Sequence, residues 1–105
     1  MANQAAIEVY GPFDQVRHAL EKLPYAGDVS TNRLGALVID LGEHALVVHY
    51  DDTTESTLIV VDGRDTDARA LEVFGQLAAV LPYAMDVTDA DLSRVLARRG
   101  AVPAA

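Results

Sequence analysis

The chain has 105 residues, with 16 acidic and 8 basic side chains and a formal net charge of −8 at pH 7. Half of its residues are hydrophobic, which is too many for a disordered acidic tail, and its charge disfavours binding to nucleic acid or to an anionic membrane. Cysteine is absent, which excludes disulfides, thiol catalysis and cysteine-metal sites.

Length and hydropathy predict one cytoplasmic domain. The N-terminal residues lack the basic segment and apolar core of a signal peptide, and no apolar run approaches the roughly 18 to 20 residues that span a bilayer. We expect a single α+β domain over residues 1–100 and a flexible C-terminal tail over residues 101–105.

The first half of the chain predicts a strand, a helix and a hairpin. Apolar and polar residues alternate over 6–10, which is typical of a strand, and apolar residues recur at helical spacing over 12–23. Strands over 34–41 and 44–50 flank Gly42-Glu43, a dipeptide that suits a two-residue hairpin turn.

The hairpin turn sets the register of its two strands by placing Ile39 opposite Leu46 and Leu37 opposite Val48. One face of the hairpin then carries only apolar and aromatic side chains: Leu37, Ile39, Leu41, Leu46, Val48 and Tyr50. The other face mixes small apolar side chains with polar ones: Ala36, Val38, Asp40, Ala45, Val47 and His49.

The second half predicts one more strand of the meander and two helices. Residues 57–62 are apolar on both faces, and a helix follows over 66–81, with Asp65 or Thr66 as its N-cap. Residues 84–87 form either a short strand or a linker. A sequence that resembles a capping box at Thr88 then predicts a third helix, which carries its basic residues near the C-terminal end: Arg94, Arg98 and Arg99.

Together these elements predict an antiparallel meander sheet of four to five strands with two or three helices, similar in topology to a ferredoxin-like sandwich. The helices over 12–23 and 66–81 pack on one face of the sheet. The second face is either covered by the third helix or left as a docking surface or dimer interface.

A heptapeptide that follows the first helix returns after the second. Leu23-Pro24-Tyr25-Ala26-Gly27-Asp28-Val29 and Leu81-Pro82-Tyr83-Ala84-Met85-Asp86-Val87 agree at six of seven positions. One interpretation is mechanical, because Leu packs the last helical turn, Pro stops the helix and Tyr covers the edge of the core. The other treats the two tyrosines and two aspartates as quasi-equivalent contact points for a partner.

No motif for catalysis, nucleotide binding or metal binding is present. The three histidines, His18, His44 and His49, lack metal-ligand spacing, and the carboxylates between Asp62 and Asp67 lack the order of a calcium loop. We therefore expect no enzyme, no cofactor and no metal.

Charge placement is the strongest functional signal. Between Asp40 and Asp67 the chain carries eight acids and one base, Arg64. We expect a partner-binding surface with Val38 and Val47 as apolar anchors and with these polar contacts: Asp40, His49, Asp51, Asp52, Glu55 and Asp62.

The predicted function is that of a small acidic domain that neutralises or escorts a basic protein partner, as immunity proteins, antitoxins and secretion chaperones do. The alternative is a dimeric ligand-sensing regulatory module without catalysis, suggested by the repeated segment and by the apolar second face of the sheet.

Overall fold

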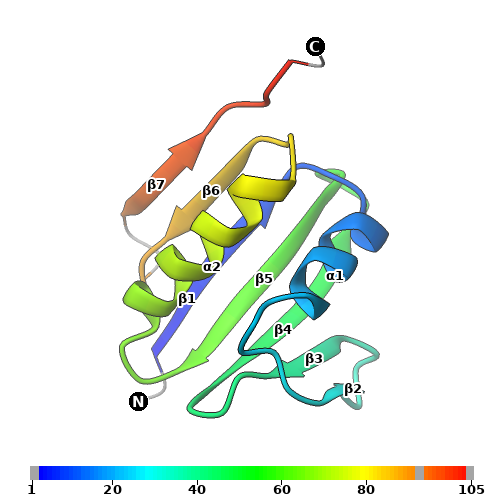
Figure 1. The fold of residues 1–105 in the computed structure, drawn as a ribbon, viewed down its shortest axis with the longest axis vertical. Coiled ribbons are helices and arrows are strands. Elements are labelled where there is room, and N and C mark those ends of the chain that lie inside the picture. Colours follow the sequence, from blue (N-terminus) through cyan, green and yellow to red (C-terminus); the bar gives the residue numbers. More distant parts are fainter. Residues whose placement is uncertain (1–2, 92–93, 104–105) are drawn as a thin grey trace.

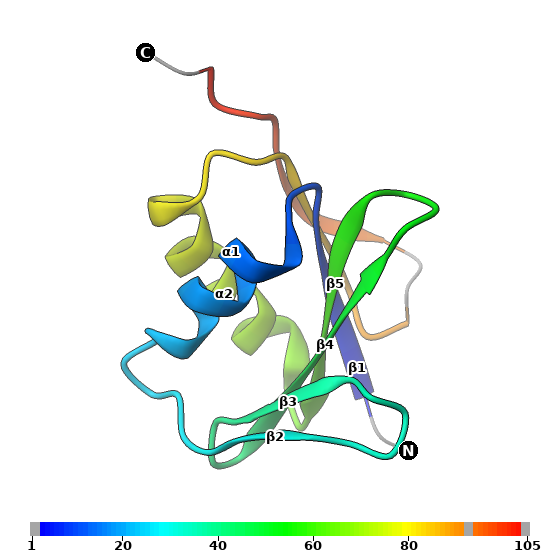
Figure 2. The same cartoon turned by 90° about the vertical axis from the view of Figure 1, so that its right-hand side faces the viewer.

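The computed structural model describes residues 3–91 and 94–103. Within these ranges the strands form one antiparallel sheet in the order β2-β3-β4-β5-β1-β6-β7. Both helices, α1 (Phe13–Glu21) and α2 (Thr66–Val80), lie on the same side of this sheet (Figures 1 and 2). The strands are β1 (Asn3–Val9), β2 (Val29–Thr31), β3 (Leu37–Asp40), β4 (His44–Asp51), β5 (Ser56–Gly63), β6 (Met85–Thr88) and β7 (Val95–Arg99).

The α+β class agrees with the sequence, but the predicted ferredoxin-like sandwich of four to five strands with two or three helices is wrong. The sheet has seven strands, and the described residues form two helices. The additional strands are the short edge strand β2 and β7, which replaces the predicted third helix. Residues 84–87, predicted as a short strand or a linker, contribute to strand β6. Among the described residues, neither helix is long and apolar enough to cross a membrane.

Long-range pairing makes residues 95–99 a strand, although their side chains suit a helix. The predicted capping box at Thr88 is instead the start of a turn, in which the Asp89 N–H donates to the Arg94 carbonyl at 3.0 Å. The Ala90 N–H donates to the Asp67 carboxylate in the first turn of α2. The open edge of β6 therefore outweighs local helix propensity here. Leu92, which falls within the predicted third helix between Thr88 and Arg94, is outside the described residues.

Arg99 joins the end of β7 to the end of α2. Its guanidinium donates to the Ala78 carbonyl at 2.9 Å, to the Tyr83 carbonyl at 2.7 Å and to the Leu81 carbonyl. The last carbonyls of a helix have no partner within the helix, and a cation is favourable there. Arg99 was expected to favour the end of its own helix, but it satisfies the end of α2 instead.

The core lies between the helices and one face of the sheet. The hairpin register is confirmed, because Ile39 pairs with Leu46 and Leu37 with Val48. The sheet residues that face the helices are almost entirely buried; the largest are Ile7, Ile39, Leu46, Val48, Ile59, Val61 and Met85. From α1 and α2, Val16, Leu20, Val73 and Leu77 pack against them, as the helical periodicity predicts.

The repeated heptapeptide ends each helix in the same way. Leu23 and Leu81 are both buried in the core. Each tyrosine then contacts the helix of the other copy: the Tyr25 ring lies 4.7 Å below the Arg69 guanidinium of α2, and the Tyr83 hydroxyl donates to Gln15 of α1. The mechanical interpretation of the repeat therefore has a structural basis, and each copy also braces the other.

We expect Arg99→Gln to lower the free energy of unfolding by about 2–4 kcal/mol, because up to three charge-assisted hydrogen bonds to backbone carbonyls are lost. Arg94→Gln is the matched control, since its side chain is 72% exposed and lies 3.7 Å from Asp89. Urea denaturation followed by circular dichroism measures both. Equal stability of the two variants would contradict the bracing role of Arg99.

Two glycine substitutions should shift stability in opposite directions. At Gly63 the φ angle is +136°, and a Cβ atom would lie 2.8 Å from the Glu43 carbonyl oxygen, so Gly63→Ala should cost about 2–4 kcal/mol. At Gly75, inside α2, a Cβ atom meets nothing within 4 Å, so Gly75→Ala should add about 0.5–1 kcal/mol. Thermal unfolding of both variants checks the prediction, which is wrong if Gly63→Ala unfolds at the wild-type temperature.

Candidate protein-binding face

A row of apolar side chains crosses the sheet on the face that points away from both helices. Val38 of β3 pairs with Val47 of β4, Val47 pairs with Val60 of β5, and Val60 pairs with Ala6 of β1. All four side chains are partly exposed. We call these four residues the apolar row. With neighbouring strands about 4.8 Å apart, the row is about 14 Å long.

Carboxylates flank the apolar row on both sides. Asp40 and Asp62 lie two residues further along β3 and β5, whereas Glu8 and Asp86 lie in register with each other on the other side of the row. Two residues along a strand correspond to about 6.7 Å, so each line of carboxylates runs close beside the row. We call the row and its neighbours on this side of the sheet the open face, which comprises Gln4, Ala6, Glu8, Val38, Asp40, Ala45, Val47, His49, Leu58, Val60, Asp62, Asp86 and Thr88.

Hydrogen bonds hold the carboxylates of Glu8 and Asp86 in place. Glu8 accepts from the Ser56 hydroxyl at 2.7 Å and from the Tyr10 hydroxyl at 2.9 Å. Asp86 accepts from the same Tyr10 hydroxyl at 3.2 Å and from Arg98 of β7 at 2.9 Å. Because these groups are already oriented, a ligand that binds them pays little ordering entropy.

The structure brings together most of the residues predicted to bind a partner. Val38, Val47, Asp40 and His49 lie on the open face, as the hairpin register predicted, and Asp62 of β5 lies there with them. The Asp40 carboxylate also accepts from the Gly42 N–H at 2.8 Å, which orients it beside the row.

The remaining three predicted residues lie away from the apolar row, at the turn that connects β4 to β5. Asp51 ends β4, pairs with Ser56 and accepts the Thr53 N–H at 2.9 Å. Asp52 and Glu55 are exposed in the turn itself, and Glu55 has a positive φ of 52°. They add negative charge near one end of the open face without flanking the apolar row.

Sequence reasoning missed Glu8 of β1 and Tyr10, the residue that follows β1, and it named Asp86 only in the partner-contact interpretation of the repeated heptapeptide. Glu8 alternates with the buried residues Ile7 and Val9, so its exposure was readable from the sequence. What the sequence did not reveal is that β1 lies between β5 and β6, which brings Glu8, Tyr10 and Asp86 together. The orientation of β5 was also undecided, and the structure places Leu58 and Val60 on the open face.

Tyr10 has a strongly perturbed acidity. Its hydrogen bond to Glu8, together with partial burial and the negative charges of Glu8 and Asp86, raises the pKa of Tyr10 to about 12. A deprotonated hydroxyl could not donate to either carboxylate and would add a third negative charge. The neutral tyrosine therefore keeps the two carboxylates close together.

On the helix side of the sheet, His44 belongs to a packed polar cluster. It is buried, its Nε2 lies within hydrogen-bonding distance of the Arg64 carbonyl, and its Nδ1 accepts from Arg69 at 3.3 Å. Arg69 also pairs with Glu72 at 2.6 Å and lies over the Tyr25 ring. Burial raises the pKa of Tyr25, and the negative charge of Glu72 raises it further. These contacts tie α2 to β4.

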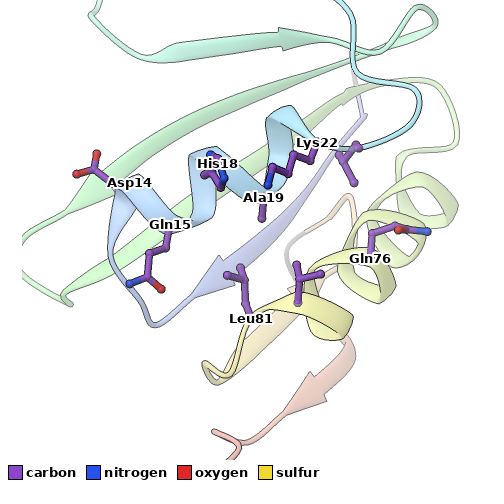
Figure 3. Close-up of a pocket in the computed structure, with 9 residues that line it drawn as sticks. Asp14, Gln15, His18, Ala19, Lys22, Gln76 and Leu81 are labelled. Atoms are coloured by element: carbon purple, nitrogen blue, oxygen red, sulfur yellow. The ribbon is translucent and has the colours of Figure 1, made fainter.

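A groove of about 560 Å³ lies between α1 and the end of α2 (Figure 3). Its apolar lining comes from Ala19, Leu23, Val80 and Leu81, and its polar lining includes His18 and Lys22. Within the part of the chain that the structure describes, no three His, Asp or Glu side chains come together as a metal site.

The raised pKa of Tyr10 predicts a loss of stability in strong alkali. Because the pKa in the folded state, about 12, exceeds the ordinary value of 10.0, the contribution of Tyr10 is complete below pH 10 and is lost as the pH rises from 10 to 12. An absorbance titration of tyrosinate should show a group that titrates near pH 12 in the wild type and is missing in Tyr10→Phe. Tyr50→Phe, a control at a similarly exposed tyrosine, should keep that group. Its persistence in Tyr10→Phe would contradict the assignment.

The open face therefore combines a partly exposed apolar row with oriented carboxylates on both sides, and the groove between the helices is a separate feature on the opposite side of the sheet. Comparison with protein families, with curated proteins and with solved structures gives no match to this chain.

Proposed function

We propose that this protein is a small acidic binding domain that holds a basic protein partner on its open face. The observation that carries the proposal is the apolar row between two lines of carboxylates. Protein interfaces commonly combine an apolar centre with a polar rim. Val38, Val47 and Val60 supply such a centre, and the flanking carboxylates supply a rim of one charge sign.

The rim selects for lysine and arginine on the partner. Carboxylates accept short, charge-assisted hydrogen bonds from both, and arginine can bind a carboxylate through two parallel bonds. The net charge of −8 also steers a basic protein towards the domain over distances longer than a contact, which speeds association at low salt.

Binding of this kind neutralises or escorts the partner without catalysis. A domain that covers a basic surface blocks whatever that surface binds, which is how an immunity protein or an antitoxin would act. Binding to the same basic surface would also keep an aggregation-prone segment of the partner in solution, as a secretion chaperone would do in the cytoplasm. Both roles use the same contacts, so the open face supports the binding step that they share.

A second copy of this chain is a poorer occupant of the open face than a basic protein. In a homodimer built on this face, the carboxylates at positions 8, 40, 62 and 86 would meet the same carboxylates of the other copy. Like charges brought together at an interface cost several kcal/mol. Arg98 is already paired with Asp86 at 2.9 Å within the same chain. Charge complementarity thus favours a basic partner over the dimeric regulatory module.

Charge reversal tests the proposal. We expect the double variant Asp40→Lys/Asp62→Lys to weaken the complex with a captured basic partner at least tenfold, because both carboxylates flank the apolar row. The control Asp14→Lys/Asp91→Lys changes the net charge equally at exposed sites outside the open face. Partners captured from an extract of the source cells are re-bound by purified variants at two salt concentrations.

A partner that binds through the open face is retained by the wild type and by the control, lost by the open-face variant, and released by salt. Val47→Asp should weaken the same complex by placing a charge within the apolar row, with circular dichroism confirming the fold. If both double variants lose the same affinity for the partner, net charge alone explains the binding and the open face is not its site. If neither variant loses affinity, the proposal is contradicted. Doubling of the wild-type mass in solution, abolished by Val47→Asp, would instead assign the open face to a homodimer.

A further inference from the structure

We infer that the groove between α1 and α2 is a binding site for a small anionic amphiphile, with the chemistry of an aliphatic carboxylate. This site is separate from the open face, since the helices that form it lie on the other side of the sheet (Figure 2). The inference goes beyond the proposed function and stands on its own residues.

The walls of the groove suit an apolar body. Ala19 of α1 and Leu23, which follows the C-cap of α1, line one side of the groove. Val80 and Leu81, at the C-terminal end of α2, line the other side. Val80 is 67% exposed, so its apolar surface is open to a ligand in the groove. A volume of about 560 Å³ falls within the range of small-molecule sites, and such sites are mostly apolar with a few placed polar groups.

The polar groups of the groove favour an anion. His18 of α1 and Lys22, the residue that caps the C-terminal end of α1, are four residues apart, and Lys22 is the single lysine of the chain. Arg17, Arg69, Arg94 and Arg98 each form an ion pair, whereas within residues 3–91 and 94–103 neither Lys22 nor His18 does. Arg33 and Arg64 are likewise without an ion pair among the described residues, but of these three cations Lys22 is the one that lines the groove.

Gln15 adds a donor at the other end of the groove. Its Oε1 accepts the Tyr83 hydroxyl at 2.5 Å, which fixes the amide and leaves its NH₂ group to donate elsewhere. Asp14 also lines the groove, but its carboxylate points away from the gap between the helices, whereas Gln15 extends into the gap (Figure 3). The groove thus offers hydrogen-bond donors and the Lys22 ammonium beside an apolar wall, which complements a carboxylate on a hydrocarbon chain.

Three probes with the same hydrocarbon tail test this chemistry: octanoate, octan-1-ol and octylammonium. Isothermal titration calorimetry on the full chain should show saturable binding of one octanoate, weaker binding of octan-1-ol, and no saturable binding of octylammonium. Decanoate should bind roughly tenfold more tightly than octanoate, because two more methylenes are buried.

Variants locate the binding in the groove. We expect Lys22→Gln to weaken octanoate binding about fivefold to tenfold and to leave octan-1-ol unchanged, whereas Ala19→Phe, which fills the groove, should abolish the binding of both. Arg33→Gln removes an exposed cation in the turn before β3 and should change neither. Circular dichroism and thermal unfolding confirm that each variant is folded.

The inference is overturned if octylammonium binds as tightly as octanoate, if Lys22→Gln leaves octanoate binding unchanged, or if none of the probes binds saturably. An effect of Arg33→Gln equal to that of Lys22→Gln would also overturn it, since attraction to any surface cation would then explain the binding. None of these results bears on the open face, whose charge-reversal variants leave the groove intact.

Discussion

The in-register pairing of β3, β4, β5 and β1 is the constraint on which both faces of the sheet depend. It aligns Ile39, Leu46, Val61 and Ala5 across the sheet beneath the helices, and all four are fully buried. The same pairing aligns the apolar row on the opposite face. Because side chains alternate, a slip of one residue would exchange the two faces, exposing the core and burying carboxylates. Core packing therefore determines the geometry of the open face.

Two helices on one side leave the sheet with one face that packs the core and one open face, for which we propose a binding role. Arg99, Thr66 and the tyrosines of the repeat all join helices to the sheet or to one another, and they lie outside the open face. On the open face the hydrogen bonds of Tyr10 and Ser56 orient carboxylates without covering the apolar row. Substitutions in the row should therefore have little effect on the core, so the proposed binding can be tested separately from folding.

The parts of the fold that local sequence determines were predictable, and those that depend on distant pairing were not. Gly42-Glu43 set the register of β3 and β4, and with it the positions of Val38, Val47, Asp40 and His49 on one face. In contrast, residues 95–99 have good helix formers and became a strand because β6 had an unpaired edge. For the same reason Glu8 was not predicted as a contact and Asp86 was not placed beside it, since their proximity depends on contacts between the two ends of the chain.

The repeat gives this chain two halves that are interleaved rather than joined end to end. β1, from the first half, lies between β5 and β6 of the second, and each repeat tyrosine contacts the helix of the other half. If the chain arose by duplication, the ancestral unit could not have closed this core alone and would have needed a second copy to insert its first strand. A chain cut in the exposed turn between β4 and β5 would recreate that situation, with two fragments that complete one sheet only by association.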